Sequence, residues 1–163
     1  MTFDSRTFRD ALGRFATGVC IVTTCDANGR PYGVTVNSFS SVSLDPPLVL
    51  FSLDRVSTSF DQFMRGSHFA VNVLCRGQMD LSRTFAATLA DKWNGVPFVT
   101  WETGAPILPG SLASLECDAV AKHDAGDHVI LVGRVRRLHC AEEGEPLLYF
   151  RGRYRDIEVP GSG

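Results

Sequence analysis

Residues 111–140 read SLASLECDAVAKHDAGDHVILVGRVRRLHC, and this stretch decides the fold. Apolar and β-branched residues fill 111–122 and 127–140, which predicts two long β-strands. Between them, Asp124-Ala125-Gly126 has the small and polar residues of a tight turn. Strands joined by so short a turn are antiparallel, so we expect a hairpin that begins an all-β C-terminal part.

The regions on either side of this hairpin also carry strand signals. Residues 146–154 follow the turn at 142–145 and predict one closing strand. Near the other end, Asp26-Ala27-Asn28-Gly29 predicts a hairpin turn because Asn and Gly adopt positive φ at little cost. Further strands are expected at 19–24, 32–37, 48–53 and 68–74, the third of them after the connection Asp45-Pro46-Pro47.

Three short helices are expected between the strands. In residues 5–17 the apolar side chains recur at helical spacing, with Asp4 or Ser5 as N-cap and Gly18 as the stop. This amphipathic face consists of Phe8, Ala11, Leu12 and Phe15. Ser57 predicts the N-cap of a second helix over 58–65, and residues 79–88 predict a third. Residues 91–110 are rich in Gly and Pro and are expected to be an ordered loop or lid.

Six or seven strands with only short helices predict a mainly β fold, a compact antiparallel barrel or sandwich. A chain of 163 residues can bury a core without disulfide or metal crosslinks. No repeat or internal linker divides it. We therefore expect residues 1–163 to form a single domain.

Composition excludes several classes of protein. The formal net charge is −2 and the arginines are scattered, which argues against nucleic-acid binding. No apolar run is long enough to span a membrane, and residues 1–9 lack the apolar region of a signal peptide, so we expect a cytoplasmic protein. The five cysteines form no C-x-x-C or zinc-like cluster, which favours free thiols and no metal site.

Small polar residues gather in two segments that each follow a strand. The first is Thr35-Val36-Asn37-Ser38-Phe39-Ser40-Ser41, whose hydroxyls and amide can bond the edge of a flat heterocycle or a phosphate. The second is Ser52-Leu53-Asp54-Arg55-Val56-Ser57-Thr58-Ser59, in which hydroxyls, one Arg and a helix N-terminus can bind an anion. The alternatives are a solvated Ser-rich loop and a simple helix cap beside a surface Arg.

Two later segments are further candidates. Gly126-Asp127-His128 places an imidazole beside a glycine turn, where it can contact a nicotinamide or its pyrophosphate. Near the C-terminus, Arg151-Gly152-Arg153-Tyr154 offers phosphate-pairing guanidinium groups and an aromatic face. A structural histidine and an edge strand with exposed arginines are the alternatives. Motifs of P-loop, serine-hydrolase, zinc-protease and Rossmann type are absent from the sequence.

Taken together, these segments resemble the short-chain flavin reductase family, which includes the reductase components of two-component flavin monooxygenases. The resemblance covers about residues 8–154. It rests on the opening segment 8–19, on Thr35 to Ser41 continuing into residues 42–49, on the Gly126-Asp127-His128 signature, and on the closing segment 147–154. Each motif is weak alone, whereas four in the same order are specific.

The resemblance implies an antiparallel Greek-key split β-barrel, the FMN-binding type, that forms a homodimer with flavin near the subunit interface. Residues of the first segment, Thr35, Val36, Asn37, Ser38, Phe39, Ser40 and Ser41, are then expected around the isoalloxazine and ribityl chain. The phosphate is expected at Ser52, Leu53, Arg55, Ser57, Thr58 and Ser59, with Thr88 approaching from the third helix. The nicotinamide cofactor is expected at Gly126, Asp127, His128, Arg151, Gly152, Arg153 and Tyr154, with His128 as the catalytic residue.

The implied activity is that of an NAD(P)H:flavin oxidoreductase. A hydride passes from nicotinamide C4 to flavin N5, and the cofactors supply this chemistry themselves. FMN or FAD, and NADH or NADPH, fit this interpretation, as does a partner monooxygenase that receives reduced flavin. Three alternatives remain: a non-catalytic flavin- or haem-binding protein of the same fold, an oxidase of the pyridoxamine-phosphate type, and a dimeric subunit that supports a monooxygenase allosterically.

Overall fold

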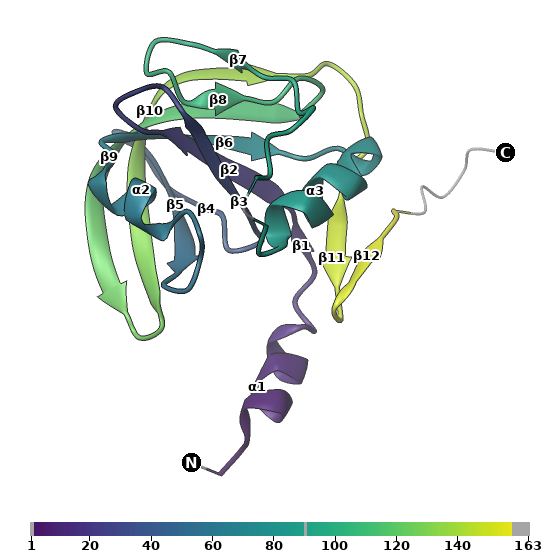
Figure 1. Ribbon diagram of the computed structural model, residues 1–163. Helices are drawn as coiled ribbons and strands as arrows, with labels where there is room; N and C mark the ends of the chain where they lie inside the picture. The colour runs from purple at the N-terminus through teal and green to yellow at the C-terminus, as the bar shows by residue number, and fades with distance from the viewer. Residues whose placement is uncertain (1, 90, 158–163) are drawn as a thin grey trace, which may run out of the picture.

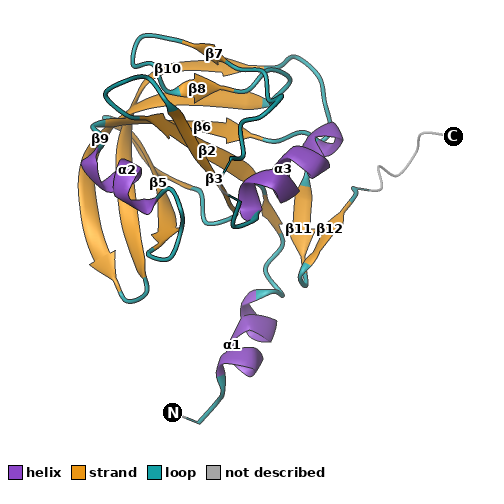
Figure 2. Cartoon of the chain, viewed as in Figure 1, coloured by secondary structure: helices purple, strands orange, loops and turns teal. Residues whose placement is uncertain are grey.

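The computed structural model describes residues 2–89 and 91–157. Its centre is a seven-stranded antiparallel sheet in the order β3-β2-β6-β9-β10-β5-β4 (Figure 1). The strands are β2 (Cys20–Cys25), β3 (Pro31–Val36), β4 (Ser40–Leu44), β5 (Pro47–Asp54), β6 (His68–Val73), β9 (Ala113–Ala125) and β10 (His128–Cys140). Strands dominate and helices are short (Figure 2), which confirms the predicted mainly β, antiparallel class.

The long hairpin expected at the outset is β9–β10. Ala125 pairs with His128, so its turn is Gly126-Asp127, one to two residues later than predicted. Gly126 has φ +67°, a conformation that glycine adopts without the strain a side chain would bring. β10 also pairs with β5 along residues 128–134, which places the hairpin tip beside the end of β5.

β4 is a strand that the sequence analysis took for part of a polar loop. Ser40–Leu44 pairs with β5 at the edge of the sheet, and four of its five residues are exposed. An edge strand with solvent on both faces lacks the apolar alternation that predicts strands. The predicted strand at 48–53 is confirmed as β5, which begins one residue earlier, at Pro47.

Side chains from both ends of the sheet meet in one core. Val36 of β3 and Phe51 of β5 belong to the same buried cluster. Just after β3, the Ser38 hydroxyl accepts from the Ser52 N–H at 2.9 Å and donates to the Ser52 carbonyl oxygen at 3.1 Å. The sheet therefore curls until its ends approach, while its backbone ladder, in the described residues, stays open between β3 and β4.

The helices are shorter than predicted. α1 (Ser5–Leu12) begins with Asp4 as N-cap, as expected, but ends at Gly13 instead of reaching Gly18. Glycine is a poor helix former, and residues 17–18 instead pair as β1 (Thr17–Gly18). α2 (Phe60–Arg65) has Ser59 as its N-cap residue, so the prediction of Ser57 was wrong. α3 (Met79–Ala86) follows the short 3-10 turn η1 (Arg76–Gln78).

The predicted closing strand is a hairpin. β11 (Leu148–Phe150) pairs with both β1 and β12 (Arg153–Arg155), and Arg151-Gly152 forms the turn. Both turn residues have positive φ, 50° and 73°. An Arg in this conformation is uncommon, which is why the run from 148 to 154 looked like one continuous strand.

The Gly- and Pro-rich segment 91–110 is an ordered loop, as predicted. It contains the small ladder of β7 (Val99–Thr100) and β8 (Pro106–Ile107). The buried Glu116 of β9 fixes the position of this segment, because one of its carboxylate oxygens accepts from both the N–H and the hydroxyl of Thr103, at 2.8 and 2.7 Å.

Among the described residues, no helix has the length and apolar character needed to cross a bilayer.

Candidate active site

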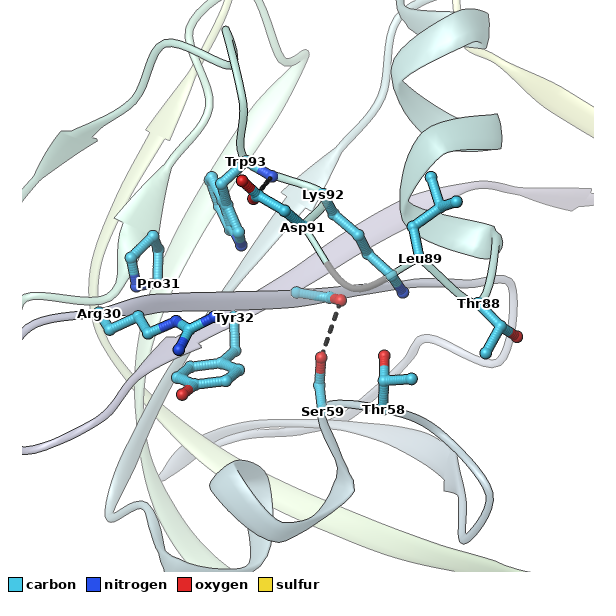
Figure 3. A pocket seen from close by; sticks show the side chains of 11 residues that line it. Arg30, Pro31, Tyr32, Thr58, Ser59, Thr88, Leu89, Asp91, Lys92 and Trp93 are labelled. Atoms are coloured by element: carbon cyan, nitrogen blue, oxygen red, sulfur yellow. Dashed lines mark hydrogen bonds between the residues drawn. The ribbon is translucent and has the colours of Figure 1, made fainter.

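A pocket of about 400 Å³ opens between the start of β3, the loop before α2 and the loop after α3 (Figure 3). This volume is typical of cofactor sites. The pocket is lined by Arg30, Pro31, Tyr32, Gly33, Thr58, Ser59, Thr88, Leu89, Asp91, Lys92 and Trp93. Three of these residues, Thr58, Ser59 and Thr88, were predicted to bind flavin, and the fold brings them together from two distant segments.

Close packing of β3 against α3 shapes the floor of this pocket. A Cβ atom on Gly33 would lie 2.7 Å from Cε1 of Phe85, so only glycine allows this approach. Phe85 is fully buried and meets Trp93 edge to face, with ring centroids 4.8 Å apart. The Ser59 hydroxyl donates to the Gly33 carbonyl oxygen at 3.1 Å and fixes the loop before α2 on β3. The walls are therefore set by rigid elements.

A second cavity of about 240 Å³ continues from the first, because Thr58, Thr88 and Lys92 line both. It extends to Thr35 and Ser57, two further residues predicted to bind flavin. We call the two cavities together the Thr58–Lys92 cleft. The Thr35 hydroxyl donates to the Ser82 carbonyl oxygen at 2.7 Å, which ties β3 to α3 beside the cleft.

Two cations line this cleft, the exposed Arg30 and the buried Lys92. The sequence analysis did not single out Lys92. Its side chain points toward Thr58 and Ser59 (Figure 3), and the residue is 9% exposed. The ammonium donates to the Phe85 carbonyl oxygen at the end of α3, at 2.9 Å. Burial lowers the pKa of Lys92.

The other residues of the 35–41 segment and its neighbour strand do not gather in the cleft. Val36 and Leu53 are buried in the core, so only their backbone groups could meet a ligand. Phe39 packs against the same core. Ser38 and Ser52 bond to each other, as described above, whereas Ser40 and Ser41 are exposed on β4. Asn37 lies instead in a third cavity, of about 880 Å³, between α1 and the β11–β12 hairpin.

Arg55 joins the loop before α2 to the tip of the β9–β10 hairpin. Its guanidinium pairs with Asp124 and donates through Nε to the Gly126 carbonyl oxygen at 3.1 Å. The Arg55 N–H also donates to the carbonyl oxygen of Asp127, at 3.0 Å. The guanidinium would have to leave these partners to reach a phosphate, so the predicted phosphate contact of Arg55 stays a prediction.

His128 stands at the base of this hairpin tip. Its Nδ1 lies 2.7 Å from Oδ1 of Asp127, and this hydrogen bond lowers the pKa of Asp127. In the sheet, His128 pairs with Asp54, and Asp54 lines the Thr58–Lys92 cleft. The predicted nicotinamide-binding turn therefore lies next to the predicted phosphate loop.

The C-terminal candidates divide between two places. Arg151 and Gly152 line the large cavity beside α1, together with Asn37. The Tyr154 hydroxyl lies 2.8 Å from Oγ of Ser82 on α3, and the Arg83 guanidinium stacks over the Tyr154 ring. Arg153 is exposed. These residues border α3 and α1 and do not line the cleft.

A comparison with known families decides the identity of the chain. The model of the flavin reductase like domain matches residues 12–158. The chain belongs to this family. The resemblance drawn from the four sequence motifs is thereby confirmed.

Relatives of this flavin reductase family member match most of its length. A flavin-dependent monooxygenase reductase subunit from Rhodococcus jostii is 43% identical over 155 residues, covering 95% of this chain and 79% of the relative. An FMN reductase (NADH) from Agrobacterium fabrum is 46% identical over 156 residues, covering 93% and 85%. The structure of a Streptomyces globisporus NADH:FAD oxidoreductase, in complex with NAD and FAD fragments, matches with a TM-score of 0.90 at 36% identity, covering 98% of this chain and 96% of that one.

Of the side of the cleft that the loop after α3 supplies, sequence reasoning named only Thr88. Lys92 and Trp93 lie at the start of the Gly- and Pro-rich segment, which looked like a lid without chemistry of its own. One signal was present: Lys92 is one of only two lysines in the chain. Its place in the cleft depends on where α3 ends, and that boundary was predicted two residues late.

Proposed function

We propose that the chain is an NAD(P)H:flavin oxidoreductase that reduces FMN or FAD by hydride transfer and supplies reduced flavin to a partner monooxygenase. One observation carries this proposal. The loop that brings Thr58 and Ser59 into the cleft is bonded, through Arg55, to the Gly126-Asp127-His128 turn. The segments expected to hold flavin and nicotinamide are thus neighbours, as transfer between two stacked rings requires.

The chemistry of the cleft fits a flavin phosphate ester. Tyr32 and Trp93 offer flat apolar walls, Thr58 and Thr88 offer hydroxyls, and Lys92 offers a positive charge. The bound flavin would supply the redox chemistry by accepting a hydride at N5 from nicotinamide C4. The protein's own residues bind and orient the two cofactors.

On the nicotinamide side, His128 is proposed to contact the second cofactor. Asp127 engages Nδ1 of the ring and leaves Nε2 available for a ligand. The hairpin turn is anchored by Arg55, so the imidazole is held in place before the cofactor arrives. Such preorganisation saves the entropy of ordering the site on binding.

The names of the relatives support the cofactor and partner assignments. One relative is named as an NADH-dependent FMN reductase and one solved structure as an NADH:FAD oxidoreductase, so both flavins and NADH are candidates for this chain. Another relative is named as the reductase subunit of a flavin-dependent monooxygenase. We infer the same kind of partner here.

A homodimer is part of the proposal. α1 projects away from the sheet (Figure 1) and contains no buried residue, although Phe8 and Leu12 form its apolar face. Val56, at the edge of the Thr58–Lys92 cleft, is 83% exposed. A second copy covering these side chains would bury apolar surface and close the cleft.

We also propose a cytoplasmic location. The five free cysteines suit a reducing, cytoplasmic setting.

One assay tests the proposed activity. Oxidation of NADH and of NADPH is followed at 340 nm with purified protein and FMN, FAD or no flavin. We expect turnover that requires added flavin. Flavin binding without nicotinamide oxidation would instead favour the non-catalytic flavin-binding alternative, and the absence of flavin binding would remove both.

A further inference from the structure

Four buried polar side chains of the sheet lie under the 91–110 segment. They come from three adjacent strands, β2, β6 and β9, and none is more than 3% exposed: Thr23, Asn72, Ser114 and Glu116. On the same face of β6, Ala70 packs against Ala105 and Ile107 of the segment. The four polar residues line none of the three cavities described above, so contact with a ligand does not explain them.

Three of these side chains bind the end of the segment through its backbone. The Thr23 hydroxyl donates to the Pro106 carbonyl oxygen at 2.6 Å. The Asn72 amide oxygen accepts from the Leu108 N–H at 2.9 Å. The Ser114 hydroxyl donates to the same amide oxygen at 3.0 Å and so fixes the orientation of Asn72. Buried backbone groups need such partners because water cannot reach them, and these bonds dock β8 on the sheet.

Glu116 holds the turn between β7 and β8. One of its carboxylate oxygens accepts from both the N–H and the hydroxyl of Thr103. The other oxygen, Oε2, is buried and has no hydrogen-bond partner in the described part of the chain. No Lys, Arg or His of residues 2–89 and 91–157 lies within ion-pairing distance of this carboxylate. Burial of a carboxyl group is costly, and the two bonds to Thr103 offset this cost.

The segment that Glu116 holds also supplies one wall of the cleft. Trp93 lines the Thr58–Lys92 cleft (Figure 3) and packs edge to face against Phe98, with ring centroids 5.2 Å apart. Phe98 directly precedes β7, whose two residues pair with β8. The other neighbour of the Trp93 ring is Phe85, on the floor of the cleft. A displacement of the β7–β8 turn would therefore reach Trp93 through packed rings.

We propose that Glu116 is a positioning residue for flavin binding: through Thr103 it keeps the 91–110 segment on the sheet, so that Trp93 forms a wall of the cleft before flavin arrives. This inference rests on the proposed function and deepens it, because it adds a residue that does not touch the ligand. A site that is only partly preformed binds more weakly in proportion. Glu116 and His128 lie toward opposite ends of the β9–β10 hairpin, so hydride transfer itself should not depend on Glu116.

The experiment uses a matched pair of substitutions. Glu116→Met removes both oxygens at similar volume, whereas Glu116→Gln keeps the oxygen that Thr103 uses and replaces only the one without a partner. Thr24→Val is the control, because it removes a buried hydrogen bond outside the segment, from Thr24 to the His68 carbonyl oxygen. In Glu116→Met the KM for FMN should rise about 3- to 10-fold at unchanged kcat, and FMN titration should show the same loss. The other two variants should stay within about twofold of the unmodified protein.

A second readout needs no flavin. Trp93 and Trp101 are the two tryptophans of the chain, and both belong to the 91–110 segment. In a Trp101→Phe background, quenching of Trp93 fluorescence by acrylamide reports how far the segment leaves the sheet. Quenching should increase in Glu116→Met and stay at the level of the parent in Glu116→Gln. Thr103→Val keeps the N–H bond and should give a smaller change of the same sign.

Several outcomes would overturn the inference. Unchanged Trp93 quenching in a folded Glu116→Met variant would show that the segment stays in place without Glu116. Increased quenching with unchanged FMN affinity would separate the segment from flavin binding, and an equal loss in Thr24→Val would assign the effect to lower stability. If Glu116→Met does not fold, Thr103→Val decides by the same two readouts. An unmodified protein that bound neither FMN nor FAD would refute the proposed function, whereas quenching would still show whether Glu116 holds Trp93.

Discussion

Arg55 donates from Nε to the carbonyl oxygen of Gly126 over 3.1 Å, a contact between residues 71 positions apart. It fastens the loop after β5 to the tip of the β9–β10 hairpin, and Asp124 binds the same guanidinium. Two segments that the sequence analysis assigned to different cofactors therefore form one unit. The relative placement of the two cofactors should depend on this contact.

The first prediction concerns Arg55→Ala. Arg55 and Asp124 are both well exposed, so the variant should lose less than about 1 kcal/mol of stability. Freeing the hairpin tip should raise the KM for NADH several-fold, while the affinity for FMN changes less. Asp124→Asn, which removes only the charged partner, should reproduce part of the effect. A selective loss of FMN over riboflavin affinity would instead support the phosphate contact expected from the sequence.

The second prediction concerns the imidazole beside this tip. His128→Ala should impair nicotinamide binding and turnover without abolishing flavin binding, because His128 lies on the hairpin and not in the wall of the Thr58–Lys92 cleft. His123, exposed on the neighbouring strand β9, is the matched control. Steady-state kinetics with NADH and a flavin titration measure the two effects. Full turnover in His128→Ala would remove this residue from the site.

The third prediction separates Asn37 from Ser38. The double variant Asn37→Ala with Ser38→Ala should weaken flavin affinity, and an unchanged titration would show that the 35–41 segment was misassigned. Of the single variants, Ser38→Ala should account for the loss of stability, about 1 kcal/mol, because it leaves both backbone groups of Ser52 without their partner. Asn37→Ala should leave the melting temperature unchanged, since Asn37 is exposed.

Much of this architecture could be predicted because the strands are apolar and their turns are marked. The β9–β10 hairpin and strands β2, β3, β5 and β6 all carry these signals. The Arg151-Gly152 turn and the edge strand β4 do not: one depends on an Arg with φ 50°, and the other exposes hydroxyls on both faces. Local sequence cannot show either feature, because neighbouring strands stabilise both.

The candidate site was predictable in its segments and not in its geometry. Thr58 belongs to a segment with the features of an anion-binding loop, Thr88 was expected near the flavin from the family resemblance, and the fold brings the two together. The position of Lys92 in the cleft depends on contacts between residues far apart in the chain, and so does the bond from Arg55 to the β9–β10 hairpin in place of a phosphate. Hydrogen bonds of this kind have no periodicity to detect. They appear only when the tertiary structure is known.

The fourth prediction concerns assembly. If a second copy covers α1, then Leu12→Glu should shift the protein from dimer to monomer, because it places a charge on the apolar face of the helix, where Leu12 is 59% exposed. Arg6→Glu, on the opposite face, also changes charge but should leave the dimer intact. Light scattering after size exclusion gives the mass. A monomeric unmodified protein, or a dimer unaffected by Leu12→Glu, would contradict the proposed interface.

The fifth prediction tests the floor of the cleft. Gly33→Ala would place a Cβ atom 2.7 Å from the Phe85 ring, which is fully buried against Trp93 and cannot move freely. Overpacking of this kind costs about 1–3 kcal/mol, and a displaced Phe85 or Trp93 would narrow the pocket, so both thermal stability and flavin affinity should fall. Gly18→Ala is the control, since nothing lies within 4 Å of the added atom. Equal behaviour of the two variants would show that β3 and α3 can separate, and the cleft would then be less rigid than its packing indicates.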